Sequence, residues 1–384
     1  MLYMTRGEAE VSLMKVEIRA GVVAGDARFP RQRRSTTVTS DTPESGAGVT
    51  SDTSSSVEQT NSVNTQKPQT LTTVATGTGN ANMTELLSPD DIEHAADLIS
   101  QADALIVAAG AGMGVDSGLP DFRGKEGFWR AYPALGREQI DFHLIACPEA
   151  FSTQPQRAWG FYGHRLNLYR QTQPHAGFQI LKSWGDTMIQ GSAVFTSNVD
   201  GQFQAAGFDQ DNIQECHGSI HHLQCMTPCC KEIWSADDFK PDVDVENCLL
   251  LNAVPTCPHC GGMARPNIMM FSDWDWMGYR QDAQDRRMEH WLSGANRPVV
   301  VEIGAGTAIP SVRHFSHHII HNFGGRLVRI NPREFTVPTR LDVGLASGSL
   351  NALVEINRAI CATTDGILMA ANEAADRWPQ ANDS

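Results

Sequence analysis

The chain has 384 residues, two to three times the usual length of one domain, so a single small module is excluded unless much of the chain is unfolded. Hydrophobic residues make up 41% and charged residues 19%, and the net charge of −14 argues against a protein that coats nucleic acid, because phosphates call for a basic stripe. No run approaches the ~18 consecutive apolar residues that cross a bilayer, so neither a membrane nor a specific nucleic acid is an expected partner.

Residues 1–84 are predicted to be a disordered, low-complexity leader. Between Ser35 and Asn80, 21 of 46 residues are Ser or Thr, and such a segment cannot bury enough surface to offset its ordering entropy. A tail that docks a partner and a plain spacer are the two interpretations of this leader. The first 34 residues lack the apolar stretch and cleavage site of a secretory signal, which favours a cytoplasmic location.

Regular structure is predicted from residue 88 onward. The sequence Ser-Pro-Asp-Asp at 88–91 is typical of a helix start and precedes apolar residues at helical spacing. Each of the short apolar runs that follow ends near a glycine or a polar turn, which is typical of buried parallel strands whose ends face a ligand crevice. These runs are 104–109, 193–196, 298–303 and 326–330.

A glycine-rich loop follows the first apolar run. Its sequence over 110–124 is Gly-Ala-Gly-Met-Gly-Val-Asp-Ser-Gly-Leu-Pro-Asp-Phe-Arg-Gly. Glycines here let the backbone approach a pyrophosphate, which the start of a helix can bind through free N–H groups. The spacing differs from the usual dinucleotide fingerprint, so a tight turn without a ligand is the competing interpretation. The Pro-Asp-Phe-Arg-Gly ending makes the loop more specific than a turn.

Polar residues follow the run at 193–196. Asn198 and Asp200, in Thr-Ser-Asn-Val-Asp-Gly, can hold the hydroxyl groups of a sugar. His217, in Glu-Cys-His-Gly, can accept a proton from such a hydroxyl because the pKa of histidine lies near neutral pH. Because the chain has 13 histidines, the presence of His217 alone does not indicate a catalytic base; the neighbouring motifs support this role.

Two groups of cysteines indicate a metal site in a reducing compartment. Cys225, Cys229 and Cys230 precede the Cys-x-x-Cys pair of Cys257 and Cys260, and such spacing fits a tetrahedral thiolate site for zinc. A complete set of four thiolates leaves no open position, which favours a structural ion. We predict ligation by Cys225, Cys229, Cys257 and Cys260, with Cys230 as the alternative to Cys229.

These elements predict an α/β fold: a Rossmann-like, doubly wound parallel sheet with a small zinc-binding module inserted. The sheet domain comprises 85–218 and 281–361, with a helical insertion at about 140–175. Cysteines, histidines, prolines and tryptophans interrupt the pattern of strands and helices over 219–280, which is therefore assigned to the zinc-binding module. Residues 362–384 are predicted to be a C-terminal tail.

The motifs occur in the order found in sirtuins, and the resemblance covers about residues 88–358. Besides those above, it includes the segment 265–273, Gly306-Thr307-Ala308 and Ile330-Asn331. The chain resembles a bacterial-like member with variant motifs. Sirtuins are NAD-dependent protein lysine deacylases, so the resemblance implies NAD and zinc as cofactors and acylated lysine in proteins or peptides as substrate. It also implies release of nicotinamide and O-acyl-ADP-ribose, with the active site between the two domains.

By this resemblance, His217 is the general base and Asn198 the second catalytic residue. The segment around Phe271 is expected to bind the acylated peptide as a strand. The residues expected to bind NAD are Ala109, Gly110, Ala111, Asp121, Phe122, Arg123, Ser197, Asn198, Asp200, Gly306, Thr307 and Asn331.

Several positions depart from the sirtuin pattern. Gly114 and Ala308 stand where sirtuins usually carry serine, Ser197 stands in place of glutamine, and Ser272-Asp273 replaces Gly-Glu. Two other functions therefore stay open: an NAD hydrolase or protein ADP-ribosyltransferase on the same fold, and a non-catalytic NAD-binding sensor. The presence of His217 and of the cysteine set favours deacylation.

Overall fold

The computed structural model describes residues 87–120 and 124–376, without the side chains of 124–126 and 364–376. The predicted leader, and three of the predicted NAD-binding residues, Asp121, Phe122 and Arg123, lie outside the described residues. Among the described helices, none is both long and apolar enough to cross a membrane.

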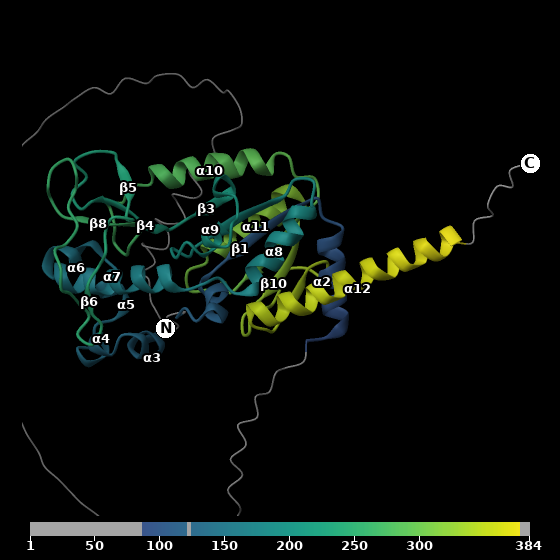
Figure 1. Cartoon of the computed structure of the whole chain (residues 1–384), viewed down its shortest axis with the longest axis horizontal. Coiled ribbons are helices and arrows are strands. Elements are labelled where there is room, and N and C mark those ends of the chain that lie inside the picture. Colours follow the sequence, from purple (N-terminus) through teal and green to yellow (C-terminus); the bar gives the residue numbers. More distant parts are fainter. Residues whose placement is uncertain (1–86, 121–123, 377–384) are drawn as a thin grey trace, which may run out of the picture. The chain divides into compact units, whose positions relative to one another are not determined.

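A six-stranded sheet forms the centre of the molecule, and all of its strand pairs are parallel (Figure 1). The four apolar runs predicted as strands are confirmed, and two short strands complete the sheet. In spatial order the strands are β11 (Val343–Leu345), β10 (Arg326–Ile330), β9 (Pro298–Ile303), β1 (Ala104–Ala109), β2 (Ser192–Thr196) and β3 (Ile213–Glu215).

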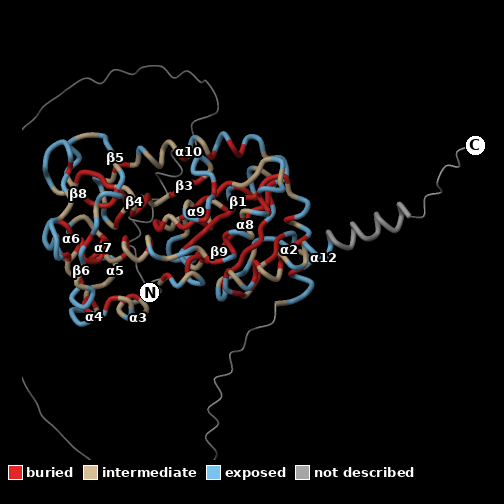
Figure 2. The backbone as a smooth tube through the Cα atoms, viewed as in Figure 1, coloured by how far each residue is buried: buried red, intermediate tan, exposed pale blue. Residues whose placement is uncertain are grey.

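Helices cover both faces of this sheet, which is why all six residues of β1 are buried (Figure 2). Successive side chains of a strand point to opposite faces. Leu105 and Val107 enter a core with α2 (Pro89–Ser100), α8 (Ala176–Thr187) and α12 (Ser349–Asp376). Ala104 and Ile106 enter a second core with α10 (Tyr279–Leu292) and α11 (Ser311–Phe323). The expected doubly wound architecture is therefore present.

A third core lies beside the sheet and joins two segments that are distant in sequence. Its centre is aromatic, with Phe128, Trp159 and Phe161 almost fully buried. Its helices are α3 (Gly124–Ala131), α4 (Pro133–Arg137), α5 (Phe142–Ile145), α6 (Pro148–Thr153) and α7 (Pro155–Gln171). Its strands are β4 (Gly218–Cys225), β5 (Ile233–Ser235), β6 (Val243–Asp244), β7 (Leu249–Leu250) and β8 (Ala264–Ile268).

The second segment of this core is an antiparallel module. Strand β4 lies between β5 and β8, and β6 pairs with β7. It occupies most of the stretch predicted as the zinc-binding module. The remaining short elements are η1 (Ala111–Ser117), α9 (Gln202–Ala205) and η2 (Gln210–Asn212). Helix α12 continues to Asp376, so the first part of the predicted tail is helical.

The turns after β1 and β9 meet backbone to backbone. Gly110 N–H donates to Ile303 O at 2.9 Å, and Gly112 N–H donates to Gly304 O at 3.2 Å. Gly304 has φ +63°, and a Cβ there would lie 2.4 Å from the Cα of Gly112. A side chain at this position cannot coexist with the turn, so glycine is required for the two loops to approach each other.

We expect Gly304→Ala to lower the free energy of unfolding by more than ~2 kcal/mol, because left-handed strain is added to a backbone clash. Gly324 has nearly the same φ, +64°, with nothing within 4 Å of an added Cβ, so it is a matched control. Gly324→Ala is expected to cost only about 1 kcal/mol. Urea unfolding of both variants measures the difference, and equal losses would contradict the steric argument.

Candidate functional site

The predicted site residues around Asn198 meet where β1 and β2 end. Ser197 N–H donates to Ala109 O at 3.1 Å, and the side-chain amide of Asn198 donates to Gly110 O at 3.0 Å. The backbone of Asn198 is fixed in turn by the hydroxyl of Thr196, which accepts from its N–H at 3.0 Å. The carboxyl ends of neighbouring parallel strands are where open α/β sheets bind ligands, so this position agrees with a ligand crevice.

His217 lies between β3 and β4. Its Nε2 lies 3.4 Å from Ser311 Oγ at the start of α11. The backbone carbonyl of Ser197 also interacts with the ring. Burial lowers the pKa of His217, against the effect of the Ser197 carbonyl, so the ring is a neutral base at pH 7.

Asp200 is buried on the loop that follows β2. Its Oδ1 accepts from Gln202 N–H at 2.9 Å, and its backbone carbonyl accepts from Nε2 of His221 at 2.9 Å. Burial raises the pKa of Asp200 to about 6, opposed by the Gln202 bond, and nearby Glu215 adds to the rise. The carboxyl group is thus fixed in place and titrates close to neutral pH.

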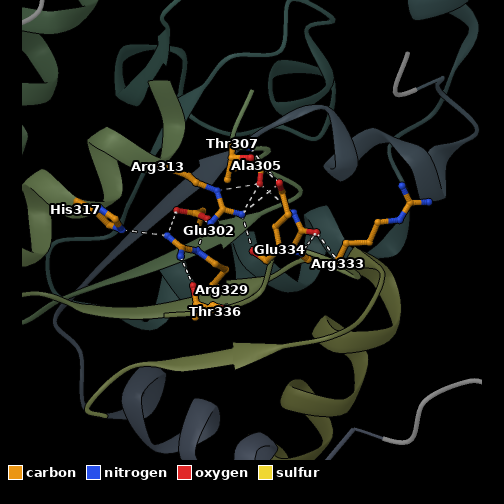
Figure 3. A network of polar contacts seen from close by, with 10 residues as sticks. Glu302, Ala305, Thr307, Arg313, His317, Arg329, Arg333, Glu334 and Thr336 are labelled. Atoms are coloured by element: carbon orange, nitrogen blue, oxygen red, sulfur yellow. Dashed lines mark hydrogen bonds and ion pairs between the residues drawn. The ribbon is translucent and has the colours of Figure 1, made fainter. Parts of the chain in front are cut away.

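Beside β1, the loop after β9 carries Gly306 and Thr307, both exposed. The N–H and hydroxyl of Thr307 donate to the carboxylate of Glu334 at 3.1 and 2.6 Å (Figure 3). Asn331 is buried beneath: its amide donates to Ala305 O at 2.9 Å, and its Oδ1 accepts from the N–H groups of Arg333 and Glu334. Asn331 therefore holds the backbone of both loops, whereas the carboxylate of Glu334 is the polar group beside Thr307.

A layer of charges supports these two loops from below (Figure 3). Arg313, on α11, donates to Ala305 O at 2.9 Å and to Glu334 O at 2.6 Å. Under it, Arg329 and Glu302 form a buried ion pair with contacts of 2.6 and 3.0 Å. They occupy paired positions of β10 and β9. We did not predict these residues, although opposite charges inside two apolar strands were a visible signal.

The four predicted zinc ligands are brought together. The sulfurs of Cys225, Cys229, Cys257 and Cys260 all lie within 4.8 Å of one another, with 3.7 Å from Cys225 to Cys260 and 3.6 Å from Cys229 to Cys257. A tetrahedron with zinc–sulfur bonds of about 2.3 Å has edges of about 3.8 Å, so these residues fit a zinc ion. Cys229, and not Cys230, belongs to the group.

The segment around Phe271 is anchored beside His217. Met269 N–H donates to His217 O at 2.9 Å, and Phe271 N–H donates to Ala146 O at 3.0 Å. The following residues differ from the sirtuin pattern but keep a defined geometry. Ser272 has φ +54°, and Asp273 forms a fully buried, two-fold ion pair with Arg265 at 2.7 and 2.8 Å.

Two other departures have different surroundings. Gly114 is buried, and a Cβ there would lie 3.0 Å from Cδ1 of Leu119, so Leu119 packs where a serine side chain would begin. Ala308 is exposed on the loop after Thr307. Of these two departures, Gly114 is therefore the one that packs closely against another side chain, that of Leu119.

Known proteins resemble the chain in sequence and in fold. The Sir2 family model matches residues 110–287. The NAD-dependent protein deacylase of Pyrococcus furiosus is 30% identical over 269 residues, which cover 68% of this chain and 96% of that protein. The NAD-dependent protein deacylase of Thermococcus kodakarensis is 27% identical over 267 residues, covering 70% and 95%.

Solved structures agree with the fold. A crystal structure of a Sir2 homologue in complex with NAD has a TM-score of 0.52 at 24% identity, covering 71% of this chain and 94% of that chain. A Sir2 homologue in complex with ADP-ribose has a TM-score of 0.51 at 24% identity, covering 71% and 97%. At this identity the likeness supports the architecture and says nothing about individual residues.

Metal content should separate the two adjacent cysteines. We expect Cys229→Ser to reduce bound zinc from about one ion per chain to well below one, because a four-thiolate site loses a ligand. Cys230→Ser, one residue away, should keep the full equivalent. Elemental analysis of both purified proteins is the measurement, and retention of zinc by Cys229→Ser would contradict the ligand assignment.

The raised pKa of Asp200 predicts a pH-dependent stability. The unfolded carboxyl ionises near its ordinary pKa, whereas the folded one resists ionisation until about pH 6, so the wild type loses stability as pH rises through this window. Asp200→Asn removes that loss. Its advantage in free energy of unfolding should grow from pH 4 to 7 and reach roughly 2–3 kcal/mol. A constant difference in denaturant unfolding at all pH values would contradict it.

Proposed function

The chain belongs to the Sir2 family, and from this premise we propose that it is an NAD-dependent protein lysine deacylase that releases nicotinamide and O-acyl-ADP-ribose. The observation that carries the proposal is the placement of His217: a half-buried ring whose Nε2 lies 3.4 Å from Ser311 Oγ at the start of α11, beside the strand ends that carry Asn198. Burial lowers the pKa of His217, which keeps the ring in the neutral form that a general base requires.

The residues around the crevice fit NAD. Ala111 and Gly306, at the starts of the loops after β1 and β9, are exposed, and backbone N–H groups at such starts suit phosphates. The Glu334 carboxylate, already held by Thr307, has the chemistry that binds a ribose diol in dinucleotide folds. We assign to the same cofactor the further residues Ala109, Gly110, Ser197 and Asp200, together with Asp121, Phe122 and Arg123.

Bound in this crevice, NAD would supply a ribose carbon for attack by the acyl-lysine oxygen, with nicotinamide as leaving group. The residues of the chain then divide the remaining work. The neutral ring of His217 accepts the proton of a ribose hydroxyl. Asn198 offers a neutral amide beside the positive charge that develops. The anchored segment at Phe271 pairs with the substrate backbone as a strand, which tolerates different sequences.

The zinc ion has a structural role in this proposal. Cys225 ends β4, whereas Cys257 and Cys260 precede β8, so an ion bound by these residues fixes the pairing of the two strands. The same pair of strands continues to His217 and Met269. Reduced thiolates require a reducing compartment, and we therefore infer that the enzyme works in the cytoplasm.

The test is to incubate the full chain with NAD and an acetyl-lysine peptide and to resolve the products by mass. Formation of nicotinamide, free lysine peptide and O-acetyl-ADP-ribose in equal amounts is the expected result. Nicotinamide release without peptide, or ADP-ribose attached to protein, would replace the proposal by the hydrolase or transferase alternative. If NAD stays intact, the non-catalytic NAD-binding sensor would be the remaining alternative.

His217→Ala should fold, bind NAD and lose deacylation by roughly 10²–10⁴-fold, the usual contribution of a positioned base. His290→Ala, which removes an exposed histidine from α10, is the matched control and should keep wild-type turnover. Steady-state rates and calorimetric NAD binding of both variants give the comparison. Wild-type turnover by His217→Ala would exclude His217 as the base.

A further inference from the structure

His175 connects the glycine turn η1 to helix α8 of the sheet domain. It is the N-cap of α8 and is only 9% exposed. Nδ1 accepts a hydrogen bond from Gly177 N–H at 3.0 Å. Since a neutral imidazole carries one proton, the proton must then lie on Nε2. Nε2 lies 3.0 Å from Met113 O, so the ring donates to the backbone of η1.

Neighbouring contacts agree with this proton assignment. Ser349, at the start of α12, donates its hydroxyl hydrogen to Asp116 Oδ2 at 2.6 Å, and its oxygen lies 3.4 Å from His175 Nε2. The oxygen is therefore free to accept from the same Nε2–H. Asp116 Oδ2 also accepts from Leu350 N–H at 2.7 Å, the first turn of α12.

The other end of η1 is held by the same residue. The backbone N–H of His175 donates to Ser117 Oγ at 3.0 Å. His175 thus contacts η1 near its middle and at its last residue, while Asp116 ties it to α12. Together, Met113, Asp116 and Ser117 fix the turn against the starts of two helices that belong to the rigid sheet layer.

We propose that His175 is a positioning residue for NAD: by donating to Met113 O it holds η1 in the conformation that receives the dinucleotide. The inference rests on the proposed function, because it takes η1 as part of the NAD site. His175 does not touch the reacting atoms, and its effect is on the affinity for NAD and not on the acylated peptide.

The imidazole has a property that a merely apolar packing residue lacks. Protonation would place a hydrogen on Nδ1 and abolish its bond from Gly177 N–H. Burial lowers the pKa of His175, while the Met113 carbonyl and the negative charge of Asp116 oppose this effect. The ring therefore stays neutral at pH 7, and protonation in acid would remove only the bond from Gly177 N–H, because Nε2–H still donates to Met113 O.

Substitution of His175 by asparagine should keep one of the two ring hydrogen bonds and remove the other. In His175→Asn the side-chain oxygen can still cap α8, because Asn is among the best N-cap residues, but the short amide cannot reach Met113. We expect its dissociation constant for NAD to rise roughly threefold to tenfold at pH 7.5, the usual effect of one lost hydrogen bond, with KM for the peptide and thermal stability near wild type. His175→Ala should lose both affinity and stability.

The control is His164→Asn. His164 is a half-buried histidine of α7 whose pKa is also lowered by burial, and its ring contacts the hydroxyl of Tyr132 in the aromatic core. Calorimetric titration with NAD should leave its affinity unchanged.

The outcomes distinguish the inference from the function on which it rests. Wild type that fails to bind NAD overturns both. Wild type that binds NAD while His175→Asn binds it equally well, at unchanged stability, overturns only the positioning role. Equal losses of NAD and peptide affinity in His175→Asn would mean a general structural defect and would also overturn it.

Discussion

The close approach of the turns after β1 and β9 is the constraint on which the site depends. Gly110 and Gly112 donate to carbonyls of the neighbouring loop, and Gly304 leaves no room for a side chain. Because β1 and β9 are adjacent parallel strands, the polar groups that follow them emerge at one edge of the sheet. The meeting point of the predicted NAD-binding residues is therefore set by backbone packing between the two turns.

Buried charge gives the second layer of that frame. Glu302 and Arg329 neutralise each other between two central strands, and Arg313 above them spans the loops that carry Thr307 and Glu334. Removing one partner of such a pair is costly because an uncompensated charge stays buried. The contacts of Arg313 with the carbonyls of Ala305 and Glu334 therefore hold the two loops to each other.

The features that could be predicted from the sequence are those that depend on a local pattern of residues. The strands, the glycine turn and the cysteine spacing were predicted because period, glycine content and Cys-x-x-Cys are local signals. The choice of Cys229 over Cys230 needed the path of the chain after β4, and the contact of Ser311 with His217 joins residues 94 positions apart. Glu334 was missed because a carboxylate on a loop has no signature until Thr307 is found beside it.

Gly114 and Leu119 form a close contact that couples two positions of the loop. A Cβ at 114 would lie 3.0 Å from Cδ1 and 3.3 Å from Cβ of the buried Leu119, so a serine there requires Leu119 to shift by a few tenths of an ångström. The cost of restoring the serine that is usual in sirtuins therefore depends on the residue at 119, and the effects of substitutions at 114 and 119 are expected not to add.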